Sequence, residues 1–303
     1  MNIQIKLAII AIAIVIPLTS FAVTQPNFTS EISTTDNSKL QVVTSATFLY
    51  EFTQNIGKEM VDVTLLVPMG ADPHDWEPTI RDTERLQRSD VIIVNGIGYE
   101  HWIGSLELTG IAGILVDTSN GISTLDSAKH GEEKHGALDP HIWLNPVYAQ
   151  LQVKNIANAL SNSDPMNKNH YQSNAEIYNQ ELNLLDAKIR TELSGCKTDF
   201  ITFHDAFSYF SEEYDLTQHT IISSTDSHGE VTLQTLENII SLARELNIKI
   251  IFAEESASTK TSQVIADEIG GKVLVLSPLE IVSDETYVEK MTQNLESLKD
   301  ALC

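Results

Sequence analysis

Eight short runs rich in β-branched and apolar residues constrain the fold of this chain more than any other feature of its sequence. Segments with apolar residues at helical spacings separate the runs, such as residues 46–60 and 233–246. Regular alternation of strand and helix is typical of parallel sheets covered by helices. The runs form two sets of four, namely residues 40–44, 63–67, 91–94 and 114–116, and residues 200–203, 220–222, 248–252 and 273–276. The pattern therefore predicts an α/β protein of two lobes, each a mostly parallel sheet flanked by helices.

A long helical pattern separates the two sets. Residues 165–193 contain no Gly, and no Pro after Pro165, and their apolar positions recur at helical spacings, namely Tyr171, Ile177, Tyr178, Leu182, Leu185 and Ile189. We predict one long rigid helix, residues 165–194, that joins an N-terminal lobe of residues 40–164 to a C-terminal lobe of residues 195–303. A helix packed wholly on one lobe is the alternative. A continuous helix is stiffer than a Gly/Ser linker, so we expect little lobe closure.

The N-terminus has the features of a secretory signal peptide over residues 1–22. Lys6 precedes an apolar run at residues 7–17, and the small residues Ser20 and Ala22 lie where a signal peptidase cleaves. The run is shorter than the ~20 residues of a membrane-spanning helix, although an uncleaved membrane anchor is an alternative. Residues 23–39 are polar and unpatterned and predict a flexible leader. We therefore expect an exported protein, periplasmic or at the cell surface, tethered to the membrane if the N-terminal segment is retained.

Charge and cysteine content narrow the range of partners. The formal net charge of -23 disfavours binding to nucleic acid, whose phosphates require a basic surface, and mildly favours the attraction of cations. Cys196 and Cys303 are the only two cysteines. In an exported protein they form either one disulfide or two unrelated thiols, and the absence of a CxxC spacing argues against a zinc–thiolate site.

Three histidines follow predicted strands of the two lobes. His74 comes after the run at residues 63–67 through a short loop, His141 lies in the sequence DPHIWLNP, and His204 directly follows residues 200–203. In open α/β sheets, ligands bind beyond the carboxyl ends of the strands, so these side chains can meet in one cleft between the lobes. Three carboxylates occupy similar positions in the second lobe, namely Glu254, Glu255 and Glu280.

This combination of residue types indicates a transition-metal site. Neutral imidazole is the commonest protein ligand of zinc, and three imidazoles with a carboxylate or water make a tetrahedral site. Asp75, Asp139 and Asp205 lie beside or near these histidines and can orient their ring N–H groups. A zinc hydrolase also uses three histidines with an open water position, but the sequence has no HExxH motif and no separate candidate for a general base. We therefore predict metal capture without catalysis, with a zinc-dependent hydrolase or a metal-holding surface adhesin as the alternatives.

Several motifs resemble one known family over nearly the whole chain after the signal. They are ADPHDWEPT with the following DVIIVNGIGYEHWI, then LDPHIWLNP, TFHDAFSYF, IFAEESASTK and ETYVEKMTQNLESL. The chain resembles the metal-binding solute receptors of ABC importers for zinc and manganese, the cluster A-I substrate-binding proteins. The resemblance implies two α/β lobes joined by a rigid helix, a metal ion bound between them, and delivery of that ion to a membrane permease. We expect the chain to act as a monomer.

Carried over residue by residue, the resemblance assigns three ligands. His74, His141 and His204 fall on the family's first three ligand positions. Manganese-type members are similar to one another in having a carboxylate at the third position, where zinc-type members have histidine. His204 therefore favours Zn²⁺ as the ligand over Mn²⁺.

The fourth ligand position departs from the family pattern. It is usually an Asp at the position that looks like Ser277 here, and serine is a poor zinc ligand. The fourth ligand is then Glu280, Glu254, Glu255 or water, and we favour Glu280. The structural alternative is that Glu280 only caps the helix that follows.

A polar loop at residues 127–138 contains His130 and His135 among charged residues and glycines. It resembles a shortened form of the His-rich loops of zinc-type receptors, which implies a second, weaker metal site that collects the ion. A solvated loop without metal is the alternative.

Overall fold

The computed structural model describes residues 39–68, 71, 75–106, 111–125, 138–222, 231–255 and 259–303. Residues 39–303 form one compact unit. The predicted signal peptide and all but the last residue of the predicted leader lie outside the described residues, and so do His74, His130 and His135. Among the described residues, no helix has the length and apolarity needed to cross a membrane.

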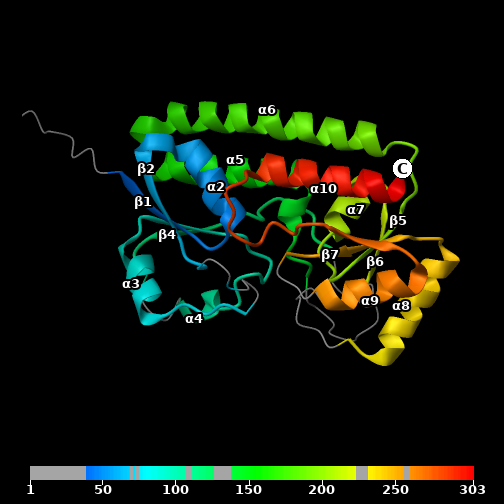
Figure 1. The fold of residues 1–303 in the computed structure, drawn as a ribbon. Coiled ribbons are helices and arrows are strands. Elements are labelled where there is room, and N and C mark those ends of the chain that lie inside the picture. Colours follow the sequence, from blue (N-terminus) through cyan, green and yellow to red (C-terminus); the bar gives the residue numbers. More distant parts are fainter. Residues whose placement is uncertain are drawn as a thin grey trace, which may run out of the picture. The chain divides into compact units, whose positions relative to one another are not determined.

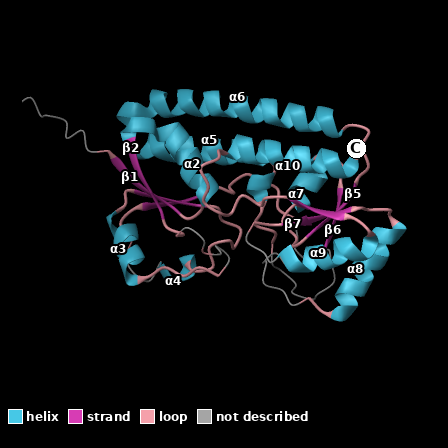
Figure 2. Cartoon of the chain, in the orientation of Figure 1, coloured by secondary structure: helices cyan, strands magenta, loops and turns pink. Residues whose placement is uncertain are grey.

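A sheet forms the centre of each lobe (Figures 1 and 2). Each sheet has four strands, all paired in parallel. The strand order is β2-β1-β3-β4 in the first lobe and β6-β5-β7-β8 in the second, so the two lobes repeat one topology. The strands of the first sheet are β1 (Leu40–Thr44), β2 (Val61–Leu65), β3 (Val91–Val94) and β4 (Ile114–Asp117). Those of the second sheet are β5 (Asp199–Thr202), β6 (Thr217–Thr220), β7 (Ile250–Ala253) and β8 (Lys272–Val275). The predicted two-lobed α/β fold is confirmed.

Some predicted strands extend beyond the strands of the structure, because buried apolar residues continue past the last paired residue. All four residues of β3 and of β7 are buried, as expected for inner strands of a parallel sheet covered on both faces. β6 ends at Thr220, whereas the sequence predicted a strand at residues 220–222. Ile221 and Ile222 are buried beyond the end of this strand. The apolar pattern therefore followed burial rather than strand pairing.

Helices connect the strands and cover the sheets. They are α2 (Thr47–Gly57), α3 (Ile80–Arg88), α4 (Ile103–Leu106), α5 (Pro146–Ser163), α6 (Lys168–Leu193), α7 (Ser208–Glu213), α8 (Leu233–Glu245), α9 (Thr259–Ile269) and α10 (Tyr287–Leu302), with short 3-10 turns η1 (Lys58–Met60), η3 (Ile142–Leu144) and η4 (Pro165–Asn167). Several begin at caps that the sequence encodes. Thr286 and Glu289 form a capping box at the start of α10, and the Asn145 side chain caps α5 with Pro146 in its first turn.

Helix α6 extends over both lobes, as Figure 1 shows. It packs against α2 and α5 of the first lobe and against α10 of the second, so the predicted joining helix is present and is not confined to one lobe. Its buried stripe consists of Tyr171, Ala175, Tyr178, Leu182, Leu185, Ile189 and Leu193. Ile177, which the periodicity placed among the apolar positions, is 55% exposed. Ile177 is adjacent to Tyr178 in sequence, and neighbouring residues of a helix cannot both face one groove.

The lobes share a continuous apolar core. The largest cluster of buried side chains includes Phe52 of α2, Leu182 of α6, Phe200 of β5 and Leu295 of α10. A smaller cluster lies on the other side of each sheet. Each sheet therefore has one face in the shared core and one in a core of its own lobe. Because the shared core spans both halves, we expect the lobes to move little relative to each other.

A disulfide joins the C-terminal residue to the beginning of the second lobe. The Sγ atoms of Cys196 and Cys303 are bonded at 1.98 Å across a sequence separation of 107 residues. The sequence left a disulfide and two free thiols as equal alternatives, and the structure has the disulfide.

Candidate metal centre

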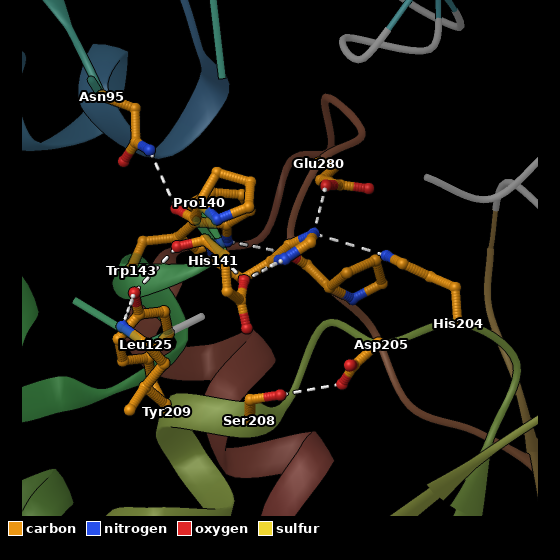
Figure 3. A network of polar contacts seen from close by, with 12 residues as sticks. Asn95, Leu125, Pro140, His141, Trp143, His204, Asp205, Ser208, Tyr209 and Glu280 are labelled. Atoms are coloured by element: carbon orange, nitrogen blue, oxygen red, sulfur yellow. Dashed lines mark hydrogen bonds and ion pairs between the residues drawn. The ribbon is translucent and has the colours of Figure 1, made fainter. Parts of the chain in front are cut away.

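His141 is held by contacts to its backbone, to its ring and to its neighbours. It lies after β4, immediately before the turn η3, and is fully buried. Asp139 Oδ1 accepts a hydrogen bond from the His141 backbone N–H at 2.9 Å and lies 2.8 Å from the ring Nδ1. The backbone oxygens of Asp139 and Pro140 accept hydrogen bonds from Tyr209 Oη at 2.8 Å and Asn95 Nδ2 at 2.9 Å, as Figure 3 shows in part. Asp139 thus orients the imidazole, and Tyr209 and Asn95 hold the backbone of the segment that carries both residues.

His204 has an equivalent arrangement in the second lobe. It lies two residues after the end of β5 and is also fully buried. Glu254, at the end of β7, accepts a hydrogen bond from the His204 backbone N–H at 3.1 Å and lies 2.6 Å from the ring Nδ1. A carboxylate on Nδ1 holds the proton there and leaves Nε2 as the nitrogen that can bind a metal.

The Nε2 atoms of the two imidazoles approach each other and Glu280. The two Nε2 atoms are 3.4 Å apart, and Glu280 Oε1 lies 3.5 Å from His141 Nε2. One ligand atom from each of His141, His204 and Glu280 lies within 4.8 Å of the others, and all three residues are buried. Figure 3 shows the two rings and the carboxylate converging from separate segments. Two imidazole nitrogens and a carboxylate oxygen are a donor set that suits Zn²⁺.

Buried carboxylates dominate the electrostatics of this cluster. Burial lowers the pKa of His141, but Asp139 and Glu280 outweigh it and raise this pKa to about 10. Burial likewise lowers the pKa of His204, and Glu254 beside its ring raises the pKa by more. The surroundings therefore stabilise positive charge at the rings, which a divalent cation supplies as well as protons do.

The other candidates for the fourth ligand have different partners. Glu254 pairs with the far side of the His204 ring. Glu255 accepts hydrogen bonds from Lys290 Nζ at 2.9 and 3.1 Å and from the Ser277 hydroxyl at 2.9 Å. Of the three described carboxylates that are candidates for this position, only Glu280 lies in one group of possible ligands with both His141 and His204. Helix α10 is capped by Thr286, so Glu280 is not its cap.

Of the three aspartates predicted to orient the rings, Asp139 does so. The Asp205 carboxylate accepts a hydrogen bond from the Ser208 hydroxyl at 2.8 Å, and the ring of His204 is oriented by Glu254 instead. The candidate partner of Asp75 is His74, which lies outside the described residues. From the sequence, we predicted Glu254 only as a candidate ligand and not as the residue that orients His204. The position of Glu254 just after a predicted strand indicated a role at the site. The local sequence pattern does not tell which atom of the His204 ring this carboxylate faces.

Comparison with known proteins identifies a family of metal-uptake components. A model of the family described as "ZnuA: Zinc-uptake complex component A periplasmic" matches residues 42–301. The chain is 38% identical over 281 residues to the high-affinity zinc uptake system protein ZnuA of Bacillus subtilis, and the match covers 87% of this chain and 88% of that protein. It resembles the solved structure of the metal-dependent lipoprotein YcdH from Bacillus subtilis with a TM-score of 0.77 and 39% identity, over 87% of this chain and 99% of that one.

A second relative is longer than this chain. The zinc-binding protein AdcA of Streptococcus pyogenes is 31% identical over 287 residues, which are 86% of this chain and 56% of AdcA. The chain thus spans about half the length of AdcA.

Proposed function

The chain belongs to the ZnuA family of periplasmic zinc-uptake components, and from this premise we propose that it captures Zn²⁺ outside the cytoplasm and delivers it to an ABC-type importer. The observation that carries the proposal is the convergence of His141, His204 and Glu280 at one buried point. These residues come from both lobes and lie 63 residues or more apart in sequence, so no local structural need explains their meeting.

The proposed ligands are His74, His141, His204 and Glu280. The three described ones supply two nitrogens and one oxygen. The motif ADPHDWEPT supports His74 as the third nitrogen donor. A tetrahedral site of three nitrogens and one oxygen suits Zn²⁺ better than Mn²⁺, which favours oxygen-rich sites.

Capture is an exchange of protons for metal in a site that is already built. Asp139 and Glu254 orient the two rings and hold a proton on each Nδ1, so Nε2 binds the ion when it loses any proton of its own. Burial of the site strengthens the attraction between the cation and the surrounding carboxylates. The match to a family of zinc-uptake components favours the receptor over the hydrolase and the adhesin.

The test measures zinc binding by competition with a chromophoric chelator in wild type, His141→Ala and His219→Ala. Removing a metal ligand should weaken zinc binding by more than the ~10–100-fold that is typical for loss of an orienting neighbour. His219 is a matched control because it also pairs with a carboxylate, Asp199, at 2.9 Å but lies on β6 outside the cluster. Equal zinc affinity in wild type and His141→Ala would refute the proposed site. Tighter binding of Mn²⁺ than of Zn²⁺ by the wild type would refute the assigned metal.

A further inference from the structure

The segment that carries Glu280 is fixed at three successive backbone carbonyls. In residues 277–280, the oxygens of the first three residues accept hydrogen bonds, in order, from Asn294 Nδ2 at 2.7 Å, Trp143 Nε1 at 2.8 Å and Thr47 Oγ1 at 3.0 Å. Three successive carbonyls engaged by side chains are unusual in a loop, because most backbone carbonyls accept hydrogen bonds from backbone groups or water. The segment therefore has little freedom just before Glu280.

Two of these three donors belong to the opposite lobe. Asn294 lies on α10 of the second lobe, whereas Thr47 opens α2 and Trp143 lies in η3, both in the first lobe. Trp143 follows His141 by two residues and is labelled beside it in Figure 3. The first lobe thus holds the backbone of a second-lobe segment.

Trp143 is itself firmly placed. Its side chain is fully buried and stacks on Phe48 with ring centroids 4.3 Å apart. Its own carbonyl accepts a hydrogen bond from Tyr287 Oη at 2.6 Å. A donor fixed on both its side chain and its backbone can define the position of the carbonyl that it contacts.

The backbone immediately before Glu280 is in an unfavourable conformation. Leu279 has φ of 61°, in the left-handed region that a residue with a side chain avoids. Such a conformation persists only where surrounding contacts hold it. The Thr47 hydroxyl contacts the carbonyl of this same residue.

We propose that Thr47 and Trp143 are positioning residues that hold Glu280 ready as a metal ligand, so that the first lobe sets the position of the second lobe's carboxylate. The inference rests on the proposed function, because it requires Glu280 to bind the ion. A carboxylate that is already in place avoids the loss of conformational freedom on binding, and this raises affinity. Disruption of either contact then weakens zinc binding without removing any ligand.

The variant Thr47→Val tests this because it removes the hydroxyl and keeps a β-branched side chain of similar size. Loss of one hydrogen bond of ordinary strength predicts a rise in the zinc Kd of about 3- to 10-fold. Thr53→Val is the matched control. It makes the same change on the same helix, at a buried hydroxyl that has no hydrogen-bond partner among the described residues, and its Kd should equal that of the wild type.

A double-variant cycle separates positioning from general destabilisation. In a Glu280→Ala background, Thr47→Val should cause no further loss of zinc affinity, because the residue it positions is absent. The absorption spectrum of bound Co²⁺ reports the ligand geometry and provides a second readout. Thr47→Val should shift this spectrum toward that of Glu280→Ala, whereas Thr53→Val should leave it unchanged.

The possible failures can be told apart. If Glu280→Ala changes neither the zinc Kd nor the Co²⁺ spectrum, Glu280 is not a ligand, and the proposed ligand set and the positioning role both fall. If Glu280→Ala acts as expected while Thr47→Val matches Thr53→Val, only the positioning role is wrong. An equal effect of Thr47→Val with and without Glu280 also overturns it.

Discussion

At the candidate metal centre, neighbouring carboxylates set the orientation and the protonation of the two histidine rings. Asp139 and Glu254 each contact one ring on Nδ1 and also accept a hydrogen bond from the backbone of the same histidine. This double contact fixes the ring orientation and the tautomer together. It also raises the pKa of both rings, so protons and zinc compete for the same nitrogens.

Zinc affinity should therefore rise with pH across and above the neutral range. The pKa of His141 is raised from 6.5 to about 10, so between these values the metal-free ring keeps a second proton on Nε2, which zinc must displace. Each displaced proton makes the apparent Kd fall by about tenfold per pH unit until the raised pKa of its ring is passed. Chelator competition between pH 6 and 9 measures this slope, and calorimetry in buffers of different ionisation enthalpy counts the protons released. An affinity that levels off above pH 7 would contradict the raised pKa.

Elements of the second lobe have separate roles. The ends of β5 and β7 place His204 and Glu254, and the segment after β8 places Glu280. Helix α10 supports this arrangement, because Lys290 pairs with Glu255 and Asn294 binds the backbone of Ser277. The far end of α10 is fastened by the disulfide between Cys196 and Cys303. Helix α10 thus connects the disulfide at its C-terminal end to the segment that carries Glu280.

Removal of the disulfide should destabilise the fold and leave the metal site intact. The double variant Cys196→Ser/Cys303→Ser should lower the free energy of unfolding by about 2–5 kcal/mol, because the bond closes a loop of 107 residues in the unfolded chain. Urea titration measures this loss, and chelator competition should give an unchanged zinc Kd. As a control, a reducing agent should shift the wild-type transition toward that of the variant and should not shift the variant. A higher zinc Kd in the folded variant would show that the disulfide also affects the geometry of the metal site.

At the scale of the whole described unit, the lobes are joined by more than a linker. The shared apolar core runs through both, and α6 packs on helices of each. Hydrogen bonds also cross between the lobes in both directions. Tyr209 of α7 binds the carbonyl of Asp139, and Thr47 and Trp143 bind the segment before Glu280. Domain closure by hinge rotation would have to break these contacts.

We expect zinc binding to change the overall dimensions very little. Small-angle X-ray scattering of the zinc-free and zinc-loaded protein should give the same radius of gyration within measurement error, because the shared core and α6 resist rotation of the lobes. A clear decrease on zinc binding would indicate hinge closure instead and would contradict the rigid connection.

The sequence by itself determined the fold class and indicated which types of residue could bind a metal. Alternating β-rich runs and helical periodicities predict two parallel-sheet lobes, because burial and backbone geometry impose those periods locally. Histidines just after the strands predict a metal site at the carboxyl ends of the sheets, because the fold brings those ends to one edge. These inferences need only the neighbourhood of each residue along the chain.

Only the tertiary structure decided between residues that are locally alike. Glu254, Glu255 and Glu280 all follow strands, yet one orients His204, one pairs with Lys290, and one reaches the two imidazoles. The pairing of Cys196 with Cys303 and the contact of Thr47 with the carbonyl of residue 279 were equally hidden. Such choices depend on distances of a few ångströms between residues 35 or more positions apart in the sequence. These distances are set by how the helices and sheets pack, on which local patterns carry no information.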